Sequence, residues 1–216
     1  MMLIKQKLVG LCKQNWGFLL FILLMFASRS SLADWYHVPS GSMLPTIEVG
    51  DRILVNKLAY RLELPFTDIA LLQTGSPERG DIVTLNSKAA QERLVKRIVG
   101  IPGDHISMIN NQLIINGQLV GYTKQQSDFY QEDLLGKDHL VQFIDVPHPK
   151  DSFTNIEIPA GYYFVMGDNR NNSIDSRYIG LVSKRELQGK ATKVITSLDK
   201  NNYYLPKTNR NLIDLN

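Results

Sequence analysis

The chain has 216 residues, enough for an anchor and one domain with a sizeable core. Lys5, Lys7 and Lys13 make residues 1–27 positive, while the other 21 basic residues balance all 21 acidic residues in the remainder. A neutral domain lacks the excess positive charge that grips nucleic acid, so no DNA or RNA partner is expected. The single cysteine, Cys12, excludes an internal disulfide.

An apolar stretch, residues 16–27, is rich in Leu, Phe, Ile and Met. Its length matches the apolar core of a signal peptide, and Ser31-Leu32-Ala33 offers small residues for cleavage. A helix continued to Tyr36 would instead reach spanning length, with aromatic residues at both interfaces. In both interpretations the preceding lysines keep the N-terminus cytoplasmic and the domain outside. The residues alone do not decide between a cleaved signal peptide and a membrane-spanning helix.

Residues 39–46, PSGSMLPT, follow this stretch closely. Proline fixes φ and glycine permits close backbone approach, so the segment predicts a shaped loop rather than a helix. Ser42 is then a candidate nucleophile at a membrane surface. The alternative is a Ser/Gly/Pro linker between the apolar stretch and the domain.

Lys96 lies in a β-branched run, 94–99, that predicts a strand. Strand alternation places it on the same face as Leu94 and Ile98. Burial there would lower the lysine pKa, and the neutral amine could take the proton of a serine hydroxyl. Lys96 is therefore the candidate base. The alternative is an edge lysine that discourages aggregation, and Lys57 is a weaker rival.

The remaining pattern is mainly β. Further strands are predicted at 52–55, 81–85, 158–166 and 191–195, and a small meander at 105–122. Residues 123–158 are polar, aromatic and irregular. We expect an antiparallel β-sheet catalytic domain at 37–104 and 159–199, with an inserted smaller β subdomain at 105–158. A polar C-terminal tail follows at 200–216.

Residues 167–177, GDNRNNSIDSR, are dense in hydrogen-bonding side chains. A solvated loop is the simplest interpretation. As part of a site, Ser173 would orient a buried lysine, while Asp175 and Arg177 would pair and brace the loop. The four histidines are scattered without metal-ligand spacing, so neither a metal nor a cofactor is expected.

The chain resembles bacterial type I signal peptidases, membrane-bound Ser/Lys proteases that remove signal peptides. The matching segments come in the family's order, at 39–46, 50–55, 79–83, 96–104 and 167–180. They lie within 36–196 and leave 123–158 unmatched. The resemblance implies a retained, single-pass transmembrane anchor at 16–36 in the bacterial cytoplasmic (inner) membrane. The tail, 1–15, would be cytoplasmic and the catalytic domain would lie on the outer side.

The resemblance also implies roles for individual residues. Ser42 would be the nucleophile and Lys96 the general base, with Ser173 hydrogen-bonded to the amine. Ser40 would join the Ser42 N–H in the oxyanion hole. The substrate would bind as an added β-strand, in shallow apolar pockets that select Ala-x-Ala, lined by Val38, Pro39, Met43, Leu94 and Val95.

Asp175 and Arg177 would form the family's structural pair beside this site. Asn171 departs from the pattern, because many relatives carry aspartate there, and this bears on loop support. A second departure is that only one hydrophobic segment is present, whereas some relatives have two. The expected partners are preproteins with signal peptides and a lipid bilayer, with no metal.

Three alternatives to a general signal peptidase stay open. The first is a specialised peptidase of one secretion or conjugation pathway that uses the same Ser/Lys dyad. The second is a repressor-type Ser/Lys autoprotease, which should carry a DNA-binding helix-turn-helix and which the apolar N-terminus opposes. The third is a secreted, non-catalytic β-module with a cleaved signal peptide.

Overall fold

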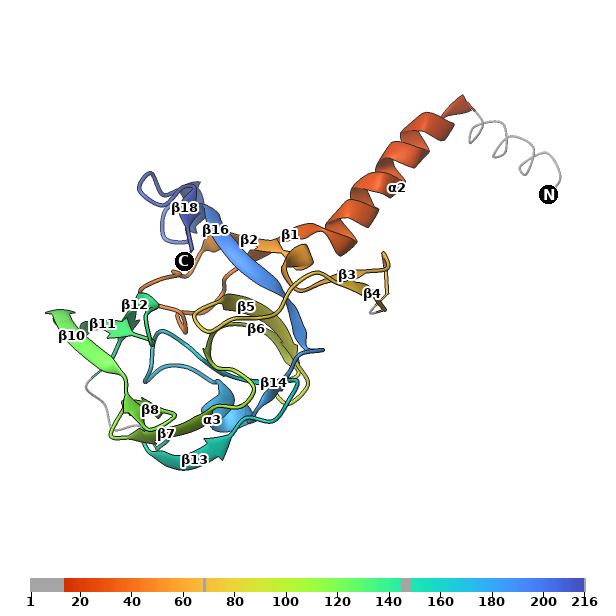
Figure 1. The fold of residues 1–216 in the computed structure, drawn as a ribbon. Coiled ribbons are helices and arrows are strands. Elements are labelled where there is room, and N and C mark those ends of the chain that lie inside the picture. Colours follow the sequence, from red (N-terminus) through yellow and green to blue (C-terminus); the bar gives the residue numbers. More distant parts are fainter. Residues whose placement is uncertain (1–13, 68, 145–148, 216) are drawn as a thin grey trace.

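The computed structural model describes residues 14–67, 69–144 and 149–215. Within them, one helix projects from a body built almost wholly of antiparallel strands (Figure 1). The predicted mainly β fold is therefore confirmed. The predicted cytoplasmic tail, 1–15, falls almost entirely outside the described residues.

The projecting helix, α2 (Trp16–Ser31), exposes large apolar side chains along most of its length. At 1.5 Å per residue its 16 residues extend about 24 Å. The helix ends five residues before the predicted end at Tyr36, because Ala33–His37 forms strand β1 and satisfies its backbone by pairing with β2. Among the described residues, no helix combines the length and the apolar character needed to cross a membrane. The transmembrane helix predicted at 16–36 is therefore not confirmed.

The main sheet runs in the order β1-β2-β16-β5-β6-β14-β15, with β17 and β18 added to β16. The runs predicted as strands each overlap one of its members. The polar segment from residue 200 also joins this sheet, because β17 and β18 pair with β16. The strands are β1 (Ala33–His37), β2 (Asp51–Asn56), β5 (Ile82–Ser87), β6 (Glu92–Gly100), β14 (Tyr162–Met166), β15 (Val182–Ser183), β16 (Leu187–Asp199), β17 (Leu205–Pro206) and β18 (Ile213–Asp214).

Three smaller sheets complete the part of the fold that the structure describes. One is the β3–β4 hairpin, the second has the order β13-β7-β8-β9, and the third has the order β10-β11-β12. Their strands are β3 (Arg61–Glu63), β4 (Ala70–Gln73), β7 (His105–Ile109), β8 (Gln112–Ile115), β9 (Gln118–Leu119), β10 (Gly121–Gln126), β11 (Phe129–Asp133), β12 (Asp138–Gln142) and β13 (Phe153–Glu157). A 3-10 helix, η1 (Lys57–Ala59), and a short helix, α3 (Ser176–Ile179), lie between strands.

The expectation that 123–158 is irregular was wrong for most of the segment, which supplies β10 to β13. Its strands bury Glu132 and His139, so they lack the alternation of apolar and polar residues that marks a half-buried strand. The partner of Glu132 is Arg170, 38 positions away. Residues 145–148, including Pro147, lie outside the described residues.

Within the described residues, three apolar clusters form the core, and two of them position the site. One cluster joins Met43 and Ile47, from the loop after β1, to Ile53 and Val55 of β2. Another contains Leu94 and Ile98 of β6. The third packs Val99, Phe164 and Met166 of the main sheet against the four-stranded sheet, so the inserted strands share a core with the main sheet.

Candidate active site

Ser42 lies in a loop that is held in place at its two ends and in its interior. Backbone hydrogen bonds from Val38 to Asp51 and from Gly50 to Val38 close its base, at 2.9 and 3.0 Å. Within the loop, the buried side chains of Met43 and Ile47 anchor the backbone in the core. Ser42 itself stays half-buried. The segment is therefore the shaped loop that its prolines and glycine predict, and not a linker.

Lys96 reaches this serine from strand β6. Its Nζ lies 2.7 Å from Ser42 Oγ and donates to the Val95 carbonyl oxygen at 2.9 Å. The side chain is 2% exposed, and the strand alternation places it beside Leu94 and Ile98. Burial lowers the pKa of Lys96 to about 8, although nearby carboxylates oppose the shift. A buried amine within reach of a serine hydroxyl has the geometry and the basicity of a general base.

Asp175 and Arg177 brace the polar loop, residues 167–177, behind the pair of Ser42 and Lys96. Arg177 Nε donates to Asp175 Oδ1 and its Nη2 to Asp175 Oδ2, both at 2.8 Å, and the Gly167 N–H donates to Asp175 Oδ2. Burial raises the pKa of the Asp175 carboxyl, but the hydrogen bonds and charge of Arg177 outweigh it and the net shift is downward. Asp175 therefore stays ionised and holds the loop by charge-assisted bonds.

Ser173 enters the same cleft, but its hydroxyl makes no hydrogen bond to Lys96 in this structure. The role predicted for it as the partner of the amine therefore stays a prediction. Because Gly167 has no Cβ, the Ser173 hydroxyl can lie near the nucleophile loop. A Cβ at that position would overlap both Ser173 Oγ and the Ser42 carbonyl oxygen.

A cleft of about 470 Å³ opens over Ser42 and Lys96. One wall comes from β1 and the following loop, and the other from the first half of β6. Of the residues predicted to contact substrate, Val38, Pro39, Leu94 and Val95 line it, as does Ser40. Met43 does not, because its side chain is turned into the core.

Residues that the sequence did not single out also line the cleft. Tyr36 stands on the β1 wall and Arg93 on the β6 wall, and the guanidinium carbon lies 4.2 Å from the centre of the Tyr36 ring. Glu92 and Ile174 lie at the same opening. These strands are not neighbours in the sheet, so no local pattern could have predicted that they meet.

Asn169 is the most informative residue that the sequence analysis missed. Its backbone N–H donates to the Ser42 carbonyl oxygen at 3.1 Å, and its side-chain amide donates to the Gly41 carbonyl oxygen at 3.1 Å. The peptide unit between Gly41 and Ser42 therefore has a fixed direction. In a trans peptide the Ser42 N–H points opposite to the Gly41 carbonyl, so Asn169 sets the direction of that N–H.

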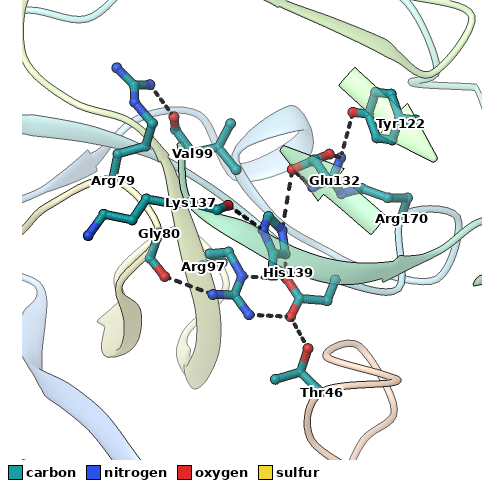
Figure 2. A network of polar contacts seen from close by, with 11 residues as sticks. Thr46, Arg79, Gly80, Arg97, Val99, Tyr122, Glu132, Lys137, His139 and Arg170 are labelled. Atoms are coloured by element: carbon teal, nitrogen blue, oxygen red, sulfur yellow. Dashed lines mark hydrogen bonds and ion pairs between the residues drawn. The ribbon is translucent and has the colours of Figure 1, made fainter. Parts of the chain in front are cut away.

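A buried ion pair lies beneath the site. Arg97, next to Lys96 on β6, forms two hydrogen bonds to Asp168, at 2.9 and 2.8 Å. Asp168 also accepts from Thr46 Oγ1 at 2.6 Å, and Arg97 donates to the Gly80 carbonyl oxygen at 2.8 Å (Figure 2). Thr46 lies in the loop that carries Ser42. The pair therefore joins the nucleophile loop to the strand that carries the base.

A second set of charges connects this pair to the inserted strands. Arg170 donates to Glu132 of β11, with Nη2 2.6 Å from Oε1. His139 of β12 places Nε2 3.3 Å from Glu132 Oε1 and 3.8 Å from Asp168 Oδ1 (Figure 2). The three-stranded sheet is thus held against the polar loop by the buried Arg170–Glu132 pair and by two backbone hydrogen bonds, from the Gln142 N–H to the Asp168 carbonyl oxygen and from the Arg170 N–H to the Gln142 carbonyl oxygen.

Comparison with known proteins identifies the family of this chain. The family model "Signal peptidase, peptidase S26" matches residues 13–196. Signal peptidase I of Pseudomonas aeruginosa is 39% identical over 195 residues, which cover 81% of this chain and 68% of that protein. Signal peptidase I P of Bacillus subtilis subsp. natto is 35% identical over 186 residues, covering 84% and 87%.

A crystal structure of a signal peptidase I from Enterococcus faecalis V583 aligns with 28% identity and a TM-score of 0.37, over 54% of this chain and 97% of that chain. The family assignment depends on the sequence comparisons alone. Because the family model spans most of the chain and the Pseudomonas relative is 39% identical over 81% of it, the chain belongs to the signal peptidase family, peptidase S26.

Proposed function

We propose that this protein is a membrane-bound serine endopeptidase that removes N-terminal signal peptides from exported preproteins and cleaves after small residues, as in Ala-x-Ala. The observation that carries the proposal is the 2.7 Å approach of Lys96 Nζ to Ser42 Oγ, at the base of a cleft open to a peptide. Family membership supplies the reaction class and the substrate class.

The proposed chemistry is acyl transfer through a Ser/Lys dyad. Neutral Lys96 takes the Ser42 hydroxyl proton as Oγ attacks the scissile carbonyl carbon. The tetrahedral intermediate collapses, the C–N bond breaks, and the Lys96 ammonium returns the proton to the leaving amine. Lys96 then takes a proton from a water molecule, which attacks the acyl carbon of the Ser42 ester. The bond to Ser42 Oγ breaks, the Lys96 ammonium returns the proton to Oγ, and the signal peptide leaves with a new carboxylate.

Two serines support this chemistry in the proposal. The Ser40 hydroxyl, which lines the cleft, and the Ser42 N–H donate to the oxyanion. Ser173 orients Lys96 once substrate closes the cleft, since catalytic hydrogen bonds often tighten only in the substrate complex. Asp175 and Arg177 keep this loop in place.

The substrate binds as an extended strand between the two cleft walls. Val38 and Pro39 on one side and Leu94 and Val95 on the other form shallow apolar pockets, and buried Met43 supports the floor. Pockets of this kind admit an alanine and reject larger side chains, which accounts for an Ala-x-Ala preference.

We further propose that α2, which ends at Ser31, lies in the lipid bilayer as part of an N-terminal anchor, with the tail, 1–15, cytoplasmic. The catalytic domain, 37–104 and 159–199, and the insert, 105–158, then lie on the outer side of the cytoplasmic membrane. The exposed Phe18, Leu23 and Leu24 of α2 support this placement, because such an apolar surface is unfavourable in water. Resistance of the full chain to alkaline extraction from membranes tests it, and complete release would contradict it.

The function is tested with the full chain in detergent and a preprotein ending its signal peptide in Ala-x-Ala. We expect one cut after the second alanine in wild type and none in Ser42→Ala or Lys96→Ala, with the site read by intact mass. Lys88→Ala, outside the cleft, serves as the matched control for loss of a lysine. Undiminished cleavage by Lys96→Ala would overturn the proposed base.

A further inference from the structure

The β6 wall of the cleft has an edge that no strand of the described residues occupies. On one side, β6 pairs with β5 along residues 92–97. On its other side, β14 pairs only within residues 97–100. Residues 92–96 therefore lack a strand partner on that side, and they are the residues of β6 that line the cleft. The opposite wall is β1, the last strand of its sheet, so a peptide between the two edges can bind as an added strand.

Arg93 lies on this edge, three residues before Lys96. At about 3.3 Å per residue, the two Cα atoms are about 10 Å apart along the strand. Leu94 and Val95, which lie between them, line the pockets proposed for the two alanines. Arg93 is therefore beyond these pockets, on the side away from the Ser/Lys dyad. In the proposed binding mode it flanks the substrate residue that precedes the first alanine of Ala-x-Ala.

The Arg93 guanidinium keeps most of its capacity to bind a ligand. Its Nε donates to Asn86 Oδ1 at 3.1 Å, and its carbon lies 4.2 Å from the centre of the Tyr36 ring on the β1 wall. These two contacts hold the planar group over the cleft. Among the described residues, neither Nη atom donates to an acceptor and no carboxylate pairs with the guanidinium, that of the adjacent Glu92 included.

We propose that Arg93 is a specificity-determining residue that selects preproteins with an acidic side chain just before Ala-x-Ala. Two unoccupied Nη groups present the planar fork that matches the two oxygens of a carboxylate. Because the cleft is open to water, the attraction is modest and gives a preference rather than an absolute requirement. The inference deepens the proposed function and rests on it for the direction in which the peptide binds.

A purely structural role for Arg93 makes a different prediction. If the guanidinium only braced the two walls through Tyr36, its loss would lower the cleavage of every peptide by the same factor. Recognition of a carboxylate instead changes the ratio between an acidic peptide and its neutral isostere. The experiment therefore measures a ratio of kcat/KM values, which the loss of a brace does not alter.

The first test uses soluble peptides that carry either Asp or Asn at the residue before the first alanine, with the full chain in an uncharged detergent. We expect kcat/KM to be about fivefold higher for the Asp peptide in wild type. The ratio should fall to about one in Arg93→Gln and invert in Arg93→Glu. It should also approach one in about 1 M salt, where the Debye length is about 3 Å.

Two controls separate this contact from general electrostatic attraction. Arg185→Gln removes an exposed arginine outside the cleft and should keep the wild-type ratio. A second peptide pair carries the Asp-to-Asn exchange far beyond the cleavage site, where we expect equal kcat/KM values. A wild-type ratio near one in the first pair would overturn the proposal. So would an equal preference in both pairs, or a preference that Arg93→Gln retains.

The second test measures binding without cleavage. In the Ser42→Ala background, fluorescence anisotropy of the labelled peptides gives Kd for each. We expect the Asp peptide to bind about fivefold more tightly than the Asn peptide, and Arg93→Gln in the same background to remove the difference. Equal Kd values would overturn the inference. Failure of wild type to cleave any of the peptides would instead contradict the proposed function, and the ratio of Kd values would still decide on Arg93.

Discussion

Asn169 and Ser42 are joined by a hydrogen bond from the Asn169 N–H to the Ser42 carbonyl oxygen, 3.1 Å long. The Asn169 side chain holds the adjacent carbonyl of Gly41 at the same distance. One residue of the polar loop thereby fixes two successive peptide groups of the nucleophile loop. Oxyanion stabilisation depends on donors that are already aligned before the charge develops, so this contact bears directly on catalysis.

Asn169→Ala removes the bond to Gly41 and leaves the backbone bond to Ser42. We expect kcat to fall about tenfold with little change in KM, because the loss affects the transition state more than substrate binding. Steady-state kinetics on a peptide substrate measure both constants. Asn202→Ala, in an exposed turn, is the control, and a rise in KM at constant kcat would contradict the assignment.

The pH dependence follows from the pKa of Lys96, about 8. Because the neutral amine is the base, kcat/KM should rise about tenfold per pH unit below that value and level off above it. The carboxylate of Glu92 raises this pKa, so Glu92→Gln should move the rising limb to lower pH. Glu186→Gln, outside the cleft, should leave it in place. A kcat/KM that falls as the pH rises through 8 would exclude Lys96 as the base.

Lys96→Met should make the protein inactive but more stable. The pKa of Lys96 in the folded chain, about 8, lies below its ordinary value of 10.5, so the unfolded chain binds more protons between these values. Stability therefore rises with pH over this window, and the buried amine costs about 3 kcal/mol at pH 7. Thermal unfolding in detergent should show the gain at pH 7 and a smaller one at pH 10. A gain that does not depend on pH would contradict the burial argument.

Gly167→Ala should abolish most activity without a charge change. The new Cβ would displace Ser173 or the Ser42 carbonyl, and a shift of about 1 Å in a catalytic loop lowers the rate about 100-fold. Gly121→Ala is the matched control, since its Cβ would meet nothing nearer than Asp133 Cβ at 3.9 Å. Comparable activity of the two variants in a peptide assay would show that the close packing of Ser173 and the Ser42 carbonyl against Gly167 is not needed for catalysis.

Asp168→Asn tests the buried pair beneath the site. It leaves the charge of Arg97 buried and incompletely paired, so we expect a loss of about 3–5 kcal/mol in the free energy of unfolding. Asp214→Asn, which breaks the exposed pair with Lys193, should change it by less than about 1 kcal/mol. Denaturant titration compares the two, and equal small effects would show that the pair contributes little.

Much of the fold was predictable, because local patterns report local structure. The β-branched runs around Ile53, Ile82 and Ile98 form strands, and the prolines and glycine around Ser42 form a loop. Two expectations, the end of the helix and the irregularity of 123–158, were wrong for non-local reasons. Residues 33–36 leave the predicted helix because β2 offers them a partner, and the strands of 123–158 depend on Arg170 to satisfy Glu132.

The sequence by itself determined the candidate chemistry: a serine in a constrained loop and a lysine on an apolar strand face, in an order of motifs shared with one family. Only the tertiary structure decided that Lys96 Nζ lies 2.7 Å from Ser42 Oγ, that Asn169 holds the nucleophile loop, and that β1 and β6 form opposite walls of one cleft. Residue type and alternation act over a few positions, whereas these contacts join segments far apart in the chain, and only the packing of the sheet brings them together.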